Sequence, residues 1–267
     1  MADKLTEKQP FQAKGEIALE LKDLHKAFGE KKVHQGVSFQ LKRGELMGLF
    51  GGSGTGKSVL IRSIIGLEKP DSGEIIFEGK DLTEFSERAF IPVRRKIGFV
   101  FQGGALFDSM SVEDNLSYPL KEHTKLSAKE IKAKVEAMLE VIDMKGSNDL
   151  LPSELSGGMQ KRAGLARATI LEPEIILFDE PTAGLDPVNT TRLMDNVKLL
   201  KEKGMTGIFV THDIPAAIEI CDRIAILKDG KVYALDTVEK ISQSDDPEIQ
   251  KFFQNAQPHP SKSGAQK

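Results

Sequence analysis

Gly51-Gly52-Ser53-Gly54-Thr55-Gly56-Lys57-Ser58 is the stretch that decides the fold. A short apolar run at residues 46–50 precedes it, and a second apolar segment at 59–65 follows. The order of strand, glycine-rich loop and helix is the context in which G-x-x-x-x-G-K-[ST] predicts a phosphate-binding loop. The glycines let backbone N–H groups turn towards an anion, and the helix adds its positive N-terminal end. A Gly/Ser-rich turn that binds nothing is the weaker alternative, because both flanking elements are present.

Two side chains of this loop have distinct predicted roles. Lys57 would reach the β- and γ-phosphates of a nucleotide, and the Ser58 hydroxyl would bind Mg²⁺. The predicted nucleotide contacts in this segment are Gly51, Gly52, Ser53, Gly54, Thr55, Gly56, Lys57, Ser58 and Val59. The stretch therefore indicates a nucleotide-binding protein.

Composition describes an ordinary globular chain that acts on membranes, if at all, through partners. Its 267 residues are 39% apolar and 29% charged, and the net charge of −3 does not suggest nucleic-acid binding. The single cysteine, Cys221, rules out an internal disulfide framework and fits a reducing cytosol. Residues 1–15 lack the apolar core of a signal peptide, and no run approaches the roughly 18 apolar residues of a membrane span.

Three short segments predict an antiparallel β patch beside the nucleotide core. The segments at residues 17–24 and 37–41 alternate apolar with polar side chains, and residues 74–79 look like a third strand that closes on a turn. Phe28 falls in the expected turn between the first two segments, where it could stack on adenine. An ordinary half-buried aromatic residue explains Phe28 equally well.

Two carboxylates end a fully apolar segment at residues 174–180, which is typical of a buried parallel strand. Acids at such a position are costly unless they bind a metal or a partner. We expect Asp179 to hold Mg²⁺ or its water shell and Glu180 to polarise the attacking water. The alternative is that both acids cap the next helix.

A second buried strand, predicted at residues 207–211, ends at His212. A lone histidine is usually packed or exposed without a chemical role. Because this strand is expected to neighbour the one that ends at Glu180, a position near the γ-phosphate is favoured for His212.

The segment at residues 103–167 is expected to be mostly helical. Ser127 and Glu130 form a capping box before an apolar stripe at helical spacing, which indicates packing. The turn Ser156-Gly157-Gly158 at the start of another helix is a second potential anion site. Arg94 is expected in a basic turn before a strand that ends at Gln102.

Later segments predict a helix that begins at Pro187, a hairpin that turns at Asp229-Gly230, and a polar tail. The tail contains an amphipathic piece around Ile249, Phe252 and Phe253, and residues 258–267 are expected to be disordered.

In this order and spacing, the motifs resemble the nucleotide-binding subunit of an ABC transporter. The resemblance extends from residue 17 to about residue 253 and rests on the following positions: the phosphate-binding loop, Gln102, residues 155–159, Asp179, Glu180, Asp186 and His212. One departure is Met159, where the family usually has glutamine. Because the serine and the glycines are retained, we expect ATP binding to survive.

The resemblance implies an α/β fold of the P-loop NTPase class. Its RecA-like parallel sheet core would be joined by an antiparallel β subdomain and an inserted α-helical subdomain. The expected domains are a flexible N-terminus at 1–15, an ABC ATPase domain at 16–242 with the helical subdomain at about 103–167, and a C-terminal tail at 243–267.

The resemblance also implies a mechanism of ATP hydrolysis in a head-to-tail homodimer. Each ATP would bind the loop of one subunit and be covered by Ser156, Gly157 and Gly158 of the other, with Asp186 contacting the partner subunit. The implied catalytic residues are Glu180 as general base, His212 on the γ-phosphate and Gln102 as its sensor. The implied Mg²⁺ ligands are Ser58, Asp179 and Gln102.

A narrower resemblance concerns residues 101–110, 115–124 and 151–154, which look like those of the Mla-type ATPases. That group energises phospholipid trafficking between the inner and outer membranes of Gram-negative bacteria. It implies a transmembrane permease, a periplasmic MCE-domain protein and a possible small regulatory subunit as partners. The ATPase would lie on the cytoplasmic face of the inner membrane.

Two other functions remain open. The ATPase of a small-solute importer would have the same chemistry with a different permease. A non-transport ABC ATPase of DNA repair or translation commonly has two nucleotide domains, long coiled coils or a basic surface. This chain has one phosphate-binding loop, no long heptad run and a slightly acidic balance, so that function ranks last.

Overall fold

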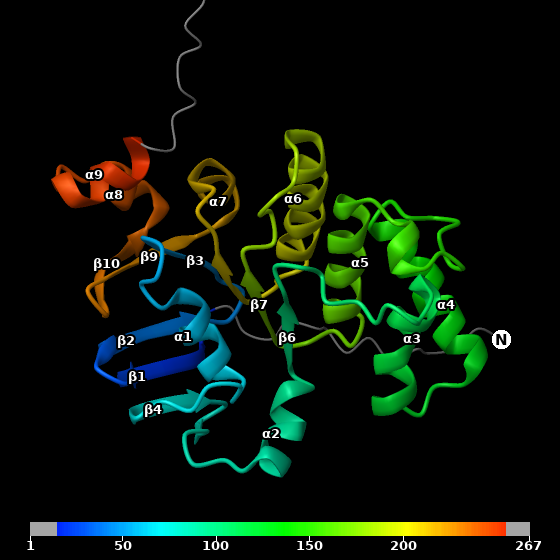
Figure 1. Cartoon of the computed structure of the whole chain (residues 1–267), viewed down its shortest axis with the longest axis horizontal. Helices are drawn as coiled ribbons and strands as arrows, with labels where there is room; N and C mark the ends of the chain where they lie inside the picture. The colour runs from blue at the N-terminus through cyan, green and yellow to red at the C-terminus, as the bar shows by residue number, and fades with distance from the viewer. Residues whose placement is uncertain (1–14, 255–267) are drawn as a thin grey trace, which may run out of the picture.

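Two β-sheets with helices around them form the architecture of the computed structural model, which describes residues 15–254 (Figure 1). The expectations of flexibility at residues 1–14 and of disorder at 258–267 lie outside the described residues. The larger sheet has the order β10-β9-β3-β8-β7-β6. Its strands are β3 (Leu46–Gly51), β6 (Ile97–Val100), β7 (Ile175–Asp179), β8 (Gly207–Val210), β9 (Arg223–Lys228) and β10 (Lys231–Thr237).

The larger sheet is parallel except at one edge. β3 pairs in parallel with β8 and β9, and β7 pairs in parallel with β6 and β8. β10 pairs antiparallel with β9 through a hairpin whose central residues, Asp229 and Gly230, have φ of 49° and 73°. Positive φ at both positions matches a type I′ turn, which confirms the predicted hairpin.

The smaller sheet confirms the predicted antiparallel β patch. Its order is β2-β1-β4-β5, with bounds β1 (Ile17–Phe28), β2 (Lys31–Lys42), β4 (Ser72–Phe77) and β5 (Lys80–Asp81). Phe28 is the last residue of β1, paired with Lys31, so its placement within the turn was wrong. The ladder continues to the end of β1, and the turn consists of Gly29 and Glu30.

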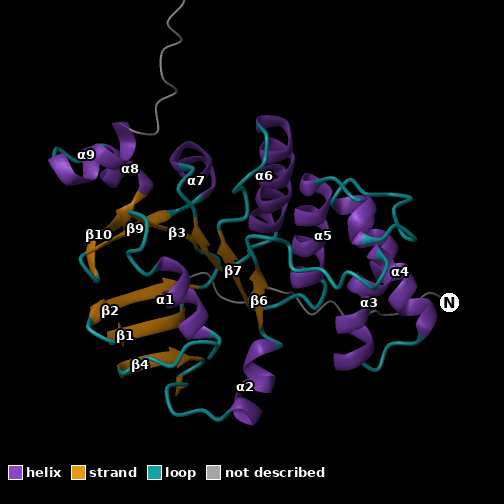
Figure 2. Cartoon of the chain, viewed as in Figure 1, coloured by secondary structure: helices purple, strands orange, loops and turns teal. Residues whose placement is uncertain are grey.

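Helices surround these sheets, and three of them gather on the side away from the smaller sheet (Figure 2). The α-helices are α1 (Lys57–Ile64), α2 (Glu87–Arg94), α3 (Val112–His123), α4 (Ala128–Val141), α5 (Gly157–Thr169), α6 (Pro187–Glu202), α7 (Ile214–Ile220), α8 (Val238–Ser242) and α9 (Pro247–Gln254), with a short 3₁₀ turn, η1, at Pro152–Glu154. Arg94 ends α2, so the expected basic turn is a helix end. Among residues 15–254, no helix is long and apolar enough to cross a membrane.

Three apolar clusters hold these layers together. α1 packs between the two sheets, where Leu60 and Ile61 are fully buried in the first cluster. The second cluster lies on the other face of the larger sheet and includes Ile249 of the amphipathic tail. The third cluster is confined to α3, α4, α5 and their connections. The helical group thus has its own core, as the predicted helical segment requires.

Candidate nucleotide site

The carboxyl ends of β3, β7 and β8 meet at one edge of the parallel sheet. These strands are neighbours in the order β3-β8-β7 and run in the same direction. Their ends place Gly51, Asp179 and the residues after Val210 side by side. In open α/β sheets this edge is where ligands bind.

The loop between β3 and α1 requires glycine at two positions because of its backbone path. Gly51 has φ of 156°, and a Cβ there would lie 2.7 Å from the Leu227 carbonyl oxygen. Gly56 has φ of 94°, and a Cβ there would lie 2.4 Å from Val33 Cγ1. Gly56 is also the N-cap of α1, so the loop directs the first N–H groups of the helix towards the site.

Lys57 folds back over the loop and is buried. Its Nζ donates to the carbonyl oxygens of Gly51 at 2.8 Å and Gly52 at 3.0 Å. Burial lowers the pKa of Lys57, and the negative charges of Glu180 and Asp179 oppose that shift. The ammonium group therefore lies against the loop backbone, within the electrostatic influence of two carboxylates.

Ser58 and Asp179 form a pair suited to a divalent cation. Ser58 Oγ donates to Asp179 Oδ1 at 2.6 Å, and Arg62 approaches Asp179 Oδ2 at 3.4 Å. Hydroxyl and carboxylate oxygens suit Mg²⁺, which usually takes one or two protein ligands and completes its shell with phosphate and water. No cluster of three or more His, Cys, Asp or Glu side chains able to hold a metal occurs within residues 15–254. The residues present fit a phosphate-bound Mg²⁺.

Glu180 and His212 contact each other beyond the ends of β7 and β8. His212 Nδ1 lies 3.2 Å from Glu180 Oε2, with 69% of the His212 side chain and 24% of the Glu180 side chain exposed. Glu180 has φ of 49°, an uncommon backbone region for a residue other than glycine. Its N–H donates to the Val210 carbonyl oxygen at 2.9 Å, which helps to hold that conformation. The adjacency of the two strands, and hence of these residues, follows the expectation.

A cavity of about 760 Å³ brings most of these groups together. Its lining residues are Phe28, Lys31, Val33, Gly51, Ser53, Gly54, Gly56, Lys57, Ser58, Val59, Glu180 and His212. Phe28 is 47% exposed at the rim, with Lys26 Nζ 4.9 Å from its ring centroid. Sequence reasoning missed Lys31 and Val33, whose signal was the i, i+2 spacing that puts both on one face of β2.

Buried His34 contacts the backbone of the phosphate-binding loop at Gly56. It is 3% exposed, and its Nε2 lies 3.1 Å from the Gly56 carbonyl oxygen. Burial, the main cause, lowers the pKa of His34, which favours the neutral imidazole. The neutral ring can donate from Nε2 to Gly56, which adds a restraint to the glycine that begins α1.

Eight predicted site residues do not line this cavity. Gly52 and Thr55 belong to the phosphate-binding loop itself, and Asp179 contacts Ser58, whereas the other five lie elsewhere. Gln102 is exposed in the turn after β6. Ser156 is the N-cap of α5 and accepts a hydrogen bond from the Met159 N–H at 3.3 Å, with Gly157 exposed and Gly158 buried beside it. Asp186 is the N-cap of α6 and is exposed. These residues are therefore separate from the phosphate-binding loop within one subunit.

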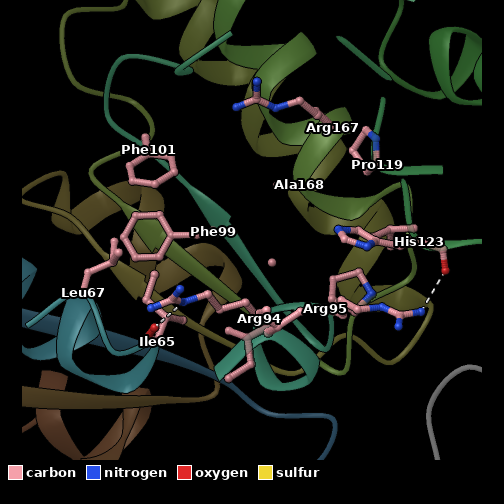
Figure 3. Close-up of a pocket in the computed structure, with 15 residues that line it drawn as sticks. Ile65, Leu67, Arg94, Arg95, Phe99, Phe101, Pro119, His123, Arg167 and Ala168 are labelled. Carbon is pink, nitrogen blue, oxygen red and sulfur yellow. Dashed lines mark hydrogen bonds between the residues drawn. The ribbon is translucent and has the colours of Figure 1, made fainter. Parts of the chain in front are cut away.

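A second hollow, of about 450 Å³, lies between the larger sheet and the helical group (Figure 3). Its lining includes Phe99 and Phe101, whose ring centroids are 4.3 Å apart. Arg95 donates to the His123 carbonyl oxygen at 2.8 Å, and Arg167 donates to the Ala105 carbonyl oxygen at 2.7 Å. We call this hollow the interlobe groove.

Comparisons with known proteins agree with this geometry. A family model described as ABC transporter matches residues 34–183. The chain is 39% identical to the intermembrane phospholipid transport system ATP-binding protein MlaF of Haemophilus influenzae, over 88% of this chain and 89% of that protein. It is 40% identical to the probable ribonucleotide transport ATP-binding protein mkl of Mycobacterium leprae, over 89% of this chain and 69% of that protein.

The fold is also similar to that of solved ATP-binding cassettes. The dimeric post-hydrolysis structure of the ATP-binding cassette MJ0796, bound to ADP and Pi, is 33% identical with a TM-score of 0.76. The match covers 82% of this chain and 98% of that one. A structure of cbiO1 from Clostridium perfringens, part of the transporter complex cbiONQ, is 32% identical with a TM-score of 0.77, covering 85% of this chain and 91% of that one.

Proposed function

This chain belongs to the ABC transporter family of ATP-hydrolysing proteins, and from that premise we propose that it energises phospholipid trafficking between two membranes. The observation behind this proposal is the similarity to MlaF proteins, which are named for intermembrane phospholipid transport. That similarity covers 88% of this chain and 89% of the H. influenzae relative, so it is not confined to the ATP-binding motifs. The bacterium would be Gram-negative, with the ATPase on the cytoplasmic face of its inner membrane.

For the ATP site we propose the following division of roles. Lys57 binds the β- and γ-phosphates, Ser58 and Asp179 hold Mg²⁺, and Phe28 stacks on adenine. Bound Mg²⁺ would neutralise phosphate charge. Glu180 accepts a proton from the attacking water, because its carboxylate lies at the cavity wall beside Lys57.

His212 then orients Glu180 and binds the γ-phosphate. The 3.2 Å contact between His212 Nδ1 and Glu180 Oε2 supports the first part of this role. The exposure of most of the His212 ring leaves its other nitrogen free to face a ligand. Gln102 would approach the γ-phosphate and Mg²⁺ only in the assembled, nucleotide-bound state.

We infer that the complete site needs two copies of the chain. Ser156, Gly157 and Gly158 lie outside the cavity of their own subunit, and they begin a helix whose positive N-terminal end suits phosphate, with Ser156 and Gly157 exposed. The dimeric state of the MJ0796 relative supports a homodimer in which this turn covers the partner's ATP. Asp186 would contact the partner across the same interface.

The interlobe groove is our proposed docking site for a membrane permease. Its lining is mostly apolar, with arginine and histidine side chains around it, and it lies between the larger sheet and the helical group (Figure 3). A segment inserted there would respond to any movement between these two bodies. An MCE-domain protein and a small regulatory subunit would join the same complex without entering this groove.

A small-solute importer is the second candidate, because the mycobacterial mkl relative is named for probable ribonucleotide transport. The match to mkl covers 69% of that protein, so mkl extends well beyond the matched region. The match to the H. influenzae MlaF covers 88% of this chain and 89% of MlaF. This difference favours the phospholipid system.

The test is affinity purification of the tagged full-length chain from detergent-solubilised native membranes, with mass spectrometry of proteins and lipids. The matched control is Lys57→Ala, which should assemble equally and differ only in nucleotide binding. We expect a multi-span permease, an MCE-domain protein and phospholipid. A permease with a soluble solute-binding protein would instead establish the importer.

A further inference from the structure

The start of α5 contacts the loop that follows β7 through a buried lysine. Lys161 is 9% exposed, and its Nζ donates to the carbonyl oxygen of Ala183. Ala183 lies between Glu180 and Asp186 in the loop that joins β7 to α6. Lys161 of α5 thus forms a hydrogen bond with the middle of the loop that begins at Glu180, the proposed base.

The burial of Lys161 is not explained by an ion pair. Within residues 15–254 no carboxylate lies within 4.0 Å of its ammonium group. Burial lowers the pKa of Lys161, and the nearby charge of Glu180 opposes that shift. A buried ammonium group without a close counter-ion is costly to keep in the fold. The hydrogen bond to the Ala183 carbonyl oxygen offsets part of this cost.

A second contact ties the same two segments together. Gly158 faces Asn189 so closely that a Cβ on the glycine would lie 2.3 Å from Asn189 Oδ1. Asn189 in turn donates from Nδ2 to Asp186 Oδ2 at 2.6 Å, and its backbone N–H donates to Asp186 Oδ1 at 3.0 Å. The first two turns of α5 therefore contact both the middle of the loop, at Ala183, and the first turn of α6, at Asn189.

The loop itself needs such support. Glu180 starts it in the left-handed region, with φ of 49°, and the Ala183 N–H donates to the Glu180 carbonyl oxygen at 3.2 Å. A strained conformation persists only where surrounding contacts hold it. Releasing Ala183 would free the turn whose first residue is Glu180.

We propose that Lys161 is a positioning residue, which holds the Glu180 loop through Ala183 and links it to the Ser156–Gly158 turn of the same subunit. This inference rests on the proposed dimer, in which that turn covers the partner's ATP. Each subunit would then connect the ATP that it covers with the ATP that it hydrolyses. Lys161 touches neither nucleotide, so its effect falls on hydrolysis and spares binding.

Lys161→Met tests the proposal, because methionine keeps the length of the side chain and removes the donor and the charge. We expect kcat for ATP hydrolysis by the full-length chain to fall at least about tenfold, since small misplacements of a catalytic group have effects of that size. KM and the affinity for a fluorescent ATP analogue should stay at wild-type values, and the thermal midpoint should not fall, because the variant removes a buried charge. Lys161→Arg, which restores a donor, should recover most of the activity.

Lys129→Met, on the exposed face of α4, is the matched control and should behave as wild type. Asn189→Ala removes the second contact and should also lower kcat without weakening nucleotide binding. Wild-type kcat in Lys161→Met would overturn the proposal. Loss of kcat together with loss of thermal stability and nucleotide binding would equally overturn it, in favour of a purely structural role.

These outcomes are separable from the proposed function. If the wild-type chain hydrolyses ATP and Glu180→Gln does not, the ATP site stands whatever Lys161→Met shows. If the wild-type chain fails to bind or hydrolyse ATP, the failure lies with the proposed site and its assembly.

Discussion

The Ser58 hydroxyl donates a 2.6 Å hydrogen bond to Oδ1 of Asp179, and this contact joins the first turn of α1 to the end of β7. These residues are 121 positions apart in the chain. Their meeting places a hydroxyl and a carboxylate where phosphate-bound Mg²⁺ would sit. The contact therefore joins the two segments to which we assign Mg²⁺ binding.

Ser58→Ala should raise the Mg²⁺ concentration needed for half-maximal ATPase activity by about tenfold, the lower end for loss of a group that supports a metal site. Magnesium titration of the steady-state rate measures this. Ser63→Ala is the matched control, because Ser63 is buried in the same helix and donates to the Val59 carbonyl oxygen. Identical titration curves for Ser58→Ala and wild type would remove Ser58 from the Mg²⁺ site.

Lys57→Ala should weaken ATP binding by about 1.5–3 kcal/mol, the usual size of a hydrogen bond to a charged group. Isothermal titration calorimetry with Mg-ATP measures the change. Lys129→Ala, on an exposed helix face, should leave the dissociation constant unaltered. Undiminished affinity in Lys57→Ala would refute the phosphate-binding role.

Glu180→Gln should retain ATP binding and lose about 10²–10⁴-fold in turnover, the range for removal of a general base. Because ATP is then bound and not consumed, the variant should accumulate as a closed dimer. Size-exclusion chromatography with multi-angle light scattering, with and without Mg-ATP, detects it. Near-normal turnover would exclude Glu180 as the base.

Much of this site was predictable because the relevant residues are close in sequence or end neighbouring strands. The glycine-rich loop lies between an apolar strand and a helix, and the Asp179-Glu180 pair ends an apolar run. Parallel pairing then brings such strand ends to one edge, which makes the proximity of His212 and Glu180 foreseeable.

Other features depend on tertiary placement and had no local signal. The contact of Lys161 with Ala183 requires the packing of α5 against the loop after β7. α2 escaped detection because it is short and contains Pro92, although Ser86 caps its start. Gln102 follows β6 as expected, but the isolated subunit does not bring it to the cavity lining.

Phe28→Ala should weaken ATP binding by about 1–3 kcal/mol, as for other aromatic platforms under a base. Inorganic tripolyphosphate, which lacks the base, should bind Phe28→Ala and wild type equally. Phe28→Tyr should preserve both affinities, because its ring can still stack. Equal losses for ATP and tripolyphosphate would place Phe28 outside adenine recognition.

His34 predicts a specific dependence of stability on pH. Burial lowers its pKa in the folded state, so near its ordinary value of 6.5 the unfolded chain binds more protons than the folded chain. The free energy of unfolding is then unaffected by His34 well above pH 6.5 and falls as the pH drops below that value. The contribution of His34 to the free energy of unfolding changes by at most about 1.4 kcal/mol per pH unit.

Urea unfolding at pH 7.5 and pH 5.5 tests this, with His34→Gln as the comparison. The wild type should lose more stability than His34→Gln between the two conditions, because the other titrating groups cancel in the comparison. Equal losses would mean that the buried imidazole is not responsible.

The proposal that this chain energises phospholipid trafficking is tested most directly by measuring ATP-dependent phospholipid movement. The measurement uses the complex purified through this chain. Donor liposomes would contain a fluorescent phospholipid, and its transfer to unlabelled acceptor liposomes would be followed. The wild-type complex would be compared with the same complex bearing Glu180→Gln. We expect phospholipid movement that requires Mg-ATP and disappears in Glu180→Gln. ATP hydrolysis that drives uptake of a small solute and leaves phospholipid in place would contradict the proposal.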